Sequence, residues 1–175
     1  MNKSTYIQLC TESDAVELRD VAFQTFEEAY KDINDPDNYE IYIKKSFTLA
    51  VIQAELAEPK SVFFFLRDTN TNAVIGYLKV RSDRSDEFFP SEPALELQRI
   101  YIKKVFWRSG YGQQLLTFAE NYAQENKFKW LWLVVFNKND AAIRFYKKEG
   151  YGIFGRKAFT FGDEIHDDFA MRKMI

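Results

Sequence analysis

Apolar residues recur along this chain at two spacings, and each spacing predicts a different kind of element. Short apolar or alternating runs bounded by turn-forming residues predict strands. Apolar positions that repeat every third and fourth residue predict the buried face of a helix. The expected strands cover residues 5–9, 61–67, 73–81, 95–102, 129–136, 151–157 and 167–174.

Helical spacing separates these strands. The first expected helix starts with a capping-box-like sequence at residues 11–14. Further helical regions are expected at residues 39–56, 110–124 and 139–150. Residues 34–38 around Pro36 are expected to break the first helix, because proline removes a backbone donor. The second region is expected to divide near Phe47, and residues 161–164 are expected to join the last two strands.

The stretch from residue 95 to residue 112 combines a strand with a glycine-containing turn that opens a helix. The first backbone N–H groups of a helix lack intrahelical partners, and the helix dipole favours negative charge there. Gly110 and Gly112 allow an anion close to the backbone, and Arg108 can add a charge-assisted contact. The turn therefore predicts a phosphate site, although plain turn chemistry also uses such glycines. It lacks the residues of a Walker A loop and the third glycine of a dinucleotide fingerprint.

A second motif follows the apolar strand expected at residues 129–136. Asn139 suits a helix N-cap, and Gly150 stands where that helix ends. Together the two motifs resemble those of the GCN5-related N-acetyltransferases (GNAT). The family's loop pattern Q/R-x-x-G-x-G/A is matched, except at its first position, by Trp107, Arg108, Ser109, Gly110, Tyr111 and Gly112. Its pattern N-x-x-A-x-x-F-Y-x-x-x-G-F is matched by Asn139, Ala142, Phe145, Tyr146, Gly150 and Tyr151.

The resemblance covers essentially the whole chain and implies one α/β (α+β) domain at residues 1–175. It implies a mixed, mostly antiparallel sheet with helices on both faces. Its two central parallel strands, 95–102 and 129–136, are expected to splay apart and hold acetyl-CoA. Residues 25–47 and 162–175 look like the PaiA-type bacterial spermidine/spermine N-acetyltransferases.

The activity implied by the resemblance is transfer of an acetyl group to a primary amine of a small molecule, with polyamines as one acceptor class. The amine would attack directly in a ternary complex. Two alternatives stay open. One keeps the chemistry with a protein, peptide or antibiotic amine as acceptor, and the other is a non-catalytic acyl-CoA-binding regulatory module.

Acetyl transfer requires that the amine lose a proton and that the leaving thiolate find a partner. The resemblance implies that Tyr146 serves the thiolate, and packing of the helix on the sheet is the alternative role. Related polyamine enzymes often carry a glutamate where this chain has Gln98, which cannot take a proton. Glu96 lies on the same face by strand alternation. Either Glu96 acts through a water, or the amine arrives neutral, or no dedicated base exists; a structural bond from Glu96 to Arg99 or a lysine is equally compatible.

Acetyl-CoA is the expected cosubstrate, and no metal is expected. Backbone amides of residues 108–113 are expected to hold the pyrophosphate, and main-chain groups at the end of the strand 95–102 to pair with the pantetheine arm. Trp107 replaces the family's glutamine or arginine, so that side-chain contact is lost. The residues expected to bind acetyl-CoA are Ile100, Tyr101, Ile102, Arg108, Ser109, Gly110, Tyr111, Gly112, Gln113, Asn139 and Lys148.

The composition mainly excludes certain classes of protein and of site. The 175 residues are 46% hydrophobic and include 17 Phe and 10 Tyr, which indicates a folded interior rich in aromatic rings. A net charge of −2 gives no electrostatic case for nucleic acid or an anionic membrane. One cysteine excludes an internal disulfide, and one histidine leaves no imidazole–thiolate metal cluster.

The N-terminal residues lack the apolar core of a signal peptide, and no apolar run is long enough for a membrane span. A cytoplasmic protein is therefore expected, and a homodimer is expected by resemblance, because relatives often form one. Acidic residues at Glu27, Glu28 and Asp32 and in the loop at 82–93 form either an electronegative mouth for a polycation or ordinary solvated charges.

Overall fold

The computed structural model describes residues 4–82, 88–89 and 92–175. Within these residues one sheet of seven strands has the order β1–β2–β3–β4–β5–β7–β6. The strands are β1 (Thr5–Leu9), β2 (Ser61–Asp68), β3 (Val74–Arg81), β4 (Ala94–Ile102), β5 (Trp130–Val135), β6 (Gly152–Phe161) and β7 (Glu164–Met174). Only the central β4–β5 pair is parallel. The predicted mixed, mostly antiparallel sheet is therefore confirmed.

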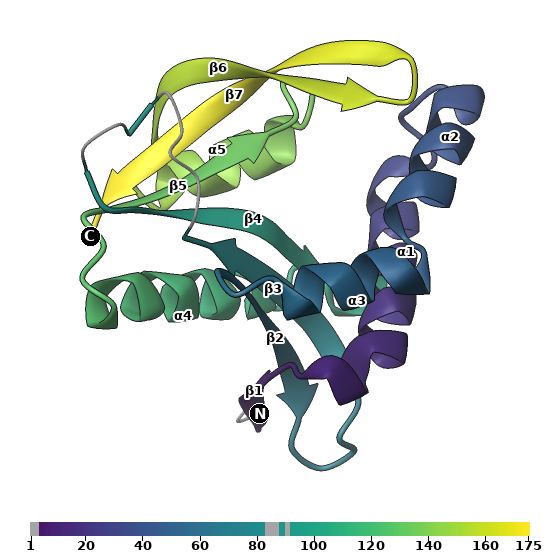
Figure 1. Cartoon of the computed structure of the whole chain (residues 1–175). Coiled ribbons are helices and arrows are strands. Elements are labelled where there is room, and N and C mark those ends of the chain that lie inside the picture. Colours follow the sequence, from purple (N-terminus) through teal and green to yellow (C-terminus); the bar gives the residue numbers. More distant parts are fainter. Residues whose placement is uncertain (1–3, 83–87, 90–91) are drawn as a thin grey trace.

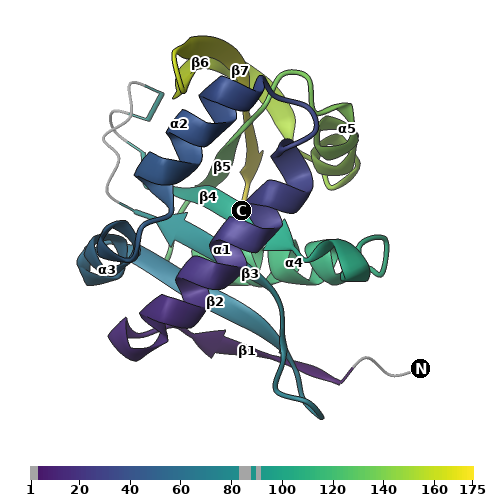
Figure 2. The ribbon, with the colours of Figure 1, turned by 90° about the vertical axis from the view of Figure 1, so that its right-hand side faces the viewer.

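Helices cover both faces of the sheet (Figure 1). They are α1 (Ala15–Tyr30), α2 (Pro36–Ser46), α3 (Leu49–Ala57), α4 (Tyr111–Glu125) and α5 (Asp140–Lys148), with 3-10 turns η1 (Glu12–Asp14) and η2 (Lys104–Phe106). Figure 2 shows α1 and α2 crossing in front of the strands. Alternation along β2 sends Phe64 and Leu66 to the core under α4, and Phe63 and Phe65 to the core under α1. The described residues contain no helix long and apolar enough to cross a membrane.

Two sequence predictions about element boundaries were wrong. The predicted break between the first two helices is present at residues 31–35, but Pro36 lies at the start of α2 rather than within the break. Asp35 caps α2 by accepting hydrogen bonds from the N–H groups of Asp37 and Asn38. Proline is favoured at the first helical position because no N–H is needed there. The strands β6 and β7 are longer than expected and join through the two residues Gly162 and Asp163. Gly162 has φ of 59°, as a tight hairpin requires.

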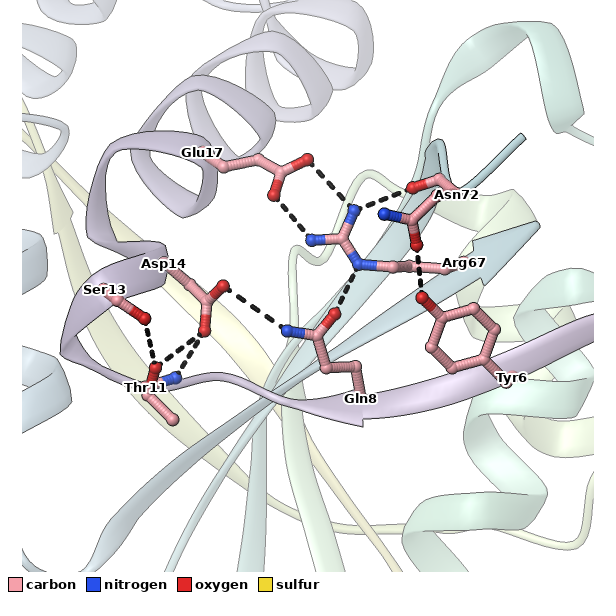
Figure 3. Close-up of polar contacts among 8 residues, drawn as sticks. All are labelled: Tyr6, Gln8, Thr11, Ser13, Asp14, Glu17, Arg67 and Asn72. Atoms are coloured by element: carbon pink, nitrogen blue, oxygen red, sulfur yellow. Dashed lines mark hydrogen bonds and ion pairs between the residues drawn. The ribbon is translucent and has the colours of Figure 1, made fainter. Parts of the chain in front are cut away.

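The start of α1 is tied to the edge of the sheet by polar side chains (Figure 3). Arg67 of β2 is almost fully buried, and its guanidinium donates two hydrogen bonds to Glu17 of α1, at 3.1 and 2.5 Å. It also donates to Gln8 of β1 and to the carbonyl of Asn72. Because one guanidinium satisfies acceptors from three elements, this cluster fixes α1 against β1 and β2 and has a structural role.

Candidate active site

The parallel strands β4 and β5 separate soon after they pair. Their register covers only Ala94–Glu96 against Trp130–Trp132, and beyond it the strands diverge (Figure 1). A cavity of about 220 Å³ fills the gap. We call it the β4–β5 cleft; its walls include residues 97–102 and 133–135 with Tyr30, Trp107, Asn139 and Tyr146. The predicted splay is therefore present.

The free edge of β4 presents main-chain groups to this cleft. The N–H of Lys103 donates to the carbonyl of Ile75 in β3 at 3.0 Å. Since main-chain groups alternate along an antiparallel strand, Tyr101 also faces β3, and Ile100 and Ile102 face the cleft. The ring of Tyr101 instead forms part of the cleft wall. The main-chain groups of both isoleucines are thus directed away from β3 and toward the cleft.

Trp107 occupies one of the main-chain acceptors at the free edge of β4. Its indole Nε1 donates a hydrogen bond of 2.7 Å to the carbonyl oxygen of Ile102, and its ring lines the cleft while 44% exposed. The carbonyl of Ile102 therefore already has a donor. Ile100 and the N–H of Ile102 remain directed at the cleft.

The turn before α4 has the geometry of an anion-binding nest. Arg108 and Gly110 have φ of 58° and 81°, with Ser109 between them at negative φ. Alternating φ signs point successive N–H groups toward one concavity. The N–H groups of Ser109, Gly110, Gly112 and Gln113 donate to no other residue in the described chain. A methyl group built on Gly112 would meet no protein atom within 4 Å, so the space above this turn is open.

Helix α5 supplies the opposite wall of the cleft. Asn139 caps it, accepting a hydrogen bond of 3.1 Å from the N–H of Ala142, and also lines the cleft. Tyr146 is 8% exposed and lines the cleft as well. Burial raises the pKa of Tyr146, so its phenol stays protonated at neutral pH. Lys148 lies exposed in the last turn of the helix.

A second cavity of about 280 Å³ adjoins the cleft. We call it the aromatic cavity, because its walls include Phe26, Tyr30, Tyr42, Phe47, Tyr77, Tyr101, Phe136, Phe159 and Phe161. The tip of the β6–β7 hairpin reaches α2, where Asn38 accepts a hydrogen bond of 2.7 Å from the N–H of Asp163. The cleft and the aromatic cavity share Tyr30, Gln98, Arg99, Tyr101 and Val134, and we call this shared set the junction.

Gln98 and Glu96 line the aromatic cavity together, as strand alternation predicted. Gln98 is the extra residue of a β-bulge, because β3 pairs with residues 97 and 99 and skips it. Its Oε1 is buried and accepts no hydrogen bond from the described residues. Glu96 is 3% exposed. The guanidinium of Arg99 binds both oxygens of Glu55 in α3, at 2.7 and 2.8 Å.

Asp168 of β7 is a second carboxylate in the aromatic cavity, and sequence reasoning missed it. It is 4% exposed, and its Oδ1 accepts a hydrogen bond of 3.1 Å from the N–H of Asn137. Burial raises its pKa, while that hydrogen bond and His166 lower it. No motif marks this residue. A signal was nevertheless present, because alternation from Ala170 places Asp168 at an inward position.

Several remaining charges have local partners. Glu27 binds Lys31 at 2.7 Å, and Glu28 accepts a hydrogen bond of 2.6 Å from the N–H of Lys104. Most of the acidic loop expected at the mouth, residues 83–87 and 90–91, lies outside the described residues. Burial raises the pKa of the Cys10 thiol to about 12, which disfavours a nucleophilic role. Where the structure is described, no group of three His, Cys, Asp or Glu side chains is placed to hold a metal ion.

Comparisons with known proteins agree with this geometry. The acetyltransferase (GNAT) family model matches residues 18–151. An uncharacterized N-acetyltransferase in the pepI 3′ region of Lactobacillus delbrueckii subsp. lactis is 32% identical over 165 residues, 94% of each chain. An uncharacterized N-acetyltransferase of Mycobacterium tuberculosis is 26% identical over 160 residues, 91% of this chain and 96% of the relative. The solved structure of PaiA N-acetyltransferase from Thermoplasma acidophilum with coenzyme A has a TM-score of 0.78 at 20% identity, covering 98% of this chain and 99% of that chain, which is a likeness in fold.

Proposed function

Because the chain belongs to the acetyltransferase (GNAT) family, we propose that it is an acetyl-CoA-dependent N-acetyltransferase acting on a primary amine of a small molecule. The observation that carries this proposal is the junction, where a cleft that lies beside the turn before α4 meets the aromatic cavity. Such a pair of cavities lets two substrates meet at one point, as direct attack in a ternary complex requires.

The residues around the cleft fit acetyl-CoA, which supplies an activated thioester. The N–H groups of residues 109–113 would hold the pyrophosphate with Arg108, in the open space above Gly112. Main-chain groups of Ile100 and Ile102 would pair with the pantetheine arm, and Asn139 and Lys148 are proposed to add contacts. The indole of Trp107 would pack beside the arm, because its donor is held by Ile102.

Tyr146 is proposed to protonate the leaving thiolate. Its phenol lines the cleft and is protonated at neutral pH, so it can donate to the sulfur, while the raised pKa makes it a weaker acid than a free tyrosine. Gln98 is proposed to orient the reacting groups at the junction, since its buried Oε1 can accept a hydrogen bond from the amine. Glu96 and Asp168 are the two carboxylates in the aromatic cavity that can receive the amine's proton.

Spermidine and spermine are the first acceptors we propose. Residues 25–47 and 162–175 resemble the PaiA-type enzymes, and the aromatic cavity combines two buried carboxylates with rings whose faces attract ammonium groups. The second candidate function is an acyl-CoA-binding module without turnover, which Gln98 in place of a carboxylate favours.

Free-thiol release from acetyl-CoA tests both candidates. The purified chain is assayed with spermidine, spermine and a panel of monoamines and peptides, while coenzyme A affinity is measured by calorimetry. Polyamine-dependent release supports the whole proposal. Release with another amine alone would keep the N-acetyltransferase and discard the polyamine. Coenzyme A binding without release under any condition would favour the binding module.

A further inference from the structure

Asp168 is a carboxylate that lies on the acceptor side of the proposed site and outside the proposed cofactor cleft. It lines the aromatic cavity but not the β4–β5 cleft. In the sheet it lies one residue beyond the β5–β7 pairing of Val135 with Phe169, near the C-terminal end of β5. Since β4 and β5 have diverged at that end, Asp168 lies on the open side of the splay.

Glu96 lies at the opposite end of the same cavity. It pairs with Trp132 in the last parallel pair of β4 and β5, where the strands are still together. An amine that reaches the junction through the aromatic cavity passes the open side of the splay. It therefore passes Asp168.

The surroundings of Asp168 suit a group that must hold and release a proton. The charged and titratable groups around it are Tyr30 of α1, Lys157 opposite it on β6 and His166 of its own strand. Arg99 and the more distant Glu96, both of β4, line the same cavity, whereas the side chain of Asp167 is exposed on the other side of β7. One oxygen is fixed by the N–H of Asn137 at 3.1 Å. A carboxyl group so buried, with one oxygen held by a backbone donor, keeps a defined orientation toward the cavity.

We propose that Asp168 is the general base that accepts the proton of the acceptor ammonium group in the aromatic cavity. This inference rests on the proposed function and adds a catalytic residue to it. Asp168 takes one proton from the ammonium, and the freed lone pair forms the C–N bond to the acetyl carbon while the C–S bond breaks. Tyr146 gives its proton to the thiolate sulfur and recovers the second proton of the nitrogen. Asp168 then returns its proton to water, so that one proton is released per acetyl transfer.

The test uses Asp168→Asn in the full chain, with the neighbouring Asp167→Asn as matched control. Asparagine keeps an oxygen for the N–H of Asn137, so the variant should fold, and thermal unfolding verifies this. Asp167 is exposed and pairs with Arg156 at 2.9 Å, so its variant should behave as the wild type. A third variant, Glu96→Gln, tests whether Glu96, the other carboxylate of the aromatic cavity, is the base instead.

For an acceptor amine of pKa about 10, Asp168→Asn should lower kcat/KM at pH 7 by about 100-fold or more. The loss should shrink to less than about tenfold for an amine of pKa about 7.5, because such an amine is already largely neutral. In the variant, kcat/KM should rise about tenfold per pH unit up to pH 9, whereas the wild type should level off above the pKa of Asp168. Coenzyme A affinity should not change, since Asp168 is outside the cleft.

Three results would overturn the inference. Asp168→Asn could match the wild type, it could lose activity equally with every amine and at every pH, or Glu96→Gln could show the amine-dependent pattern instead. In each case an active wild type leaves the N-acetyltransferase standing. An inactive wild type that still binds coenzyme A would overturn the proposed function and this inference together.

Discussion

Replacing Gly112 with alanine should separate cofactor binding from stability. Gly112 is the second residue of α4, its φ lies outside the left-handed region, and an added methyl group meets no protein atom within 4 Å. The unliganded variant should gain about 0.4–1 kcal/mol, because alanine restricts the unfolded chain more than glycine does. For a chain of this length that gain raises Tm by about 1–4 °C.

The same methyl group should weaken coenzyme A binding. It enters the open space beside Gly112, whose N–H is one of those proposed to hold the phosphate. A tenfold rise in Kd, about 1.4 kcal/mol, is the smallest effect expected. At a ligand concentration of about 100 times the wild-type Kd, the wild type gains about 2.7 kcal/mol and a tenfold weaker variant about 1.4 kcal/mol. The order of the two Tm values should therefore reverse when coenzyme A is added.

Calorimetry with coenzyme A and thermal unfolding with and without it measure both effects. Gly152→Ala is the matched control, since its added methyl group also meets nothing within 4 Å and Gly152 lies in β6, away from the cleft. The control should bind coenzyme A as the wild type does. Unchanged affinity in Gly112→Ala would refute the assignment of the turn as the pyrophosphate site.

Three other predictions follow from individual side chains. Tyr146→Phe should lower kcat at least about tenfold with coenzyme A affinity nearly unchanged, and unchanged turnover would remove the thiolate role. Arg67→Leu should cost about 1–3 kcal/mol in denaturant unfolding, because three elements lose a shared donor, while equal stability would show the cluster to be dispensable. Burial lowers the pKa of Lys79 to about 8, so the folded state binds fewer protons than the unfolded state between about pH 8 and 10, and stability relative to Lys79→Met should rise with pH there. Parallel stability curves for those two proteins at pH 7.5 and 9.5 would contradict that shift.

The sequence was informative where local rules decide the structure. The glycines of the turn, the cap at Asn139 and the alternation that places Glu96 with Gln98 follow from spacing within one element, and the structure agrees with each. The sequence located the break between α1 and α2 but placed the start of α2 too late, because proline can also open a helix and the cap at Asp35 sets that start.

The chemistry of the site depends on contacts between distant segments, which spacing cannot reveal. Asp168 enters the aromatic cavity because β7 inserts between β5 and β6, and strand order is set by packing of the whole sheet. Tyr30 reaches the junction from the last turn of α1 and has no motif of its own. Trp107 was expected only to remove a contact, whereas it also binds the carbonyl of Ile102.

Gln98 and Trp107 are the two departures from the family pattern, and both line the cleft. The cleft is formed in spite of these two substitutions. Trp107 donates a hydrogen bond to the carbonyl of Ile102, so that carbonyl already has a donor. The N–H groups of the turn before α4 are not affected, so only one of several expected contacts to the cofactor is changed. Gln98 cannot accept a proton, yet the junction it lines opens on the same aromatic cavity as Asp168. A proton acceptor needs access to the amine rather than a place on β4. Because the cavity is shared by β4, β6, β7 and α1, a carboxylate on β7 can meet that need, and a glutamine at residue 98 is therefore compatible with turnover.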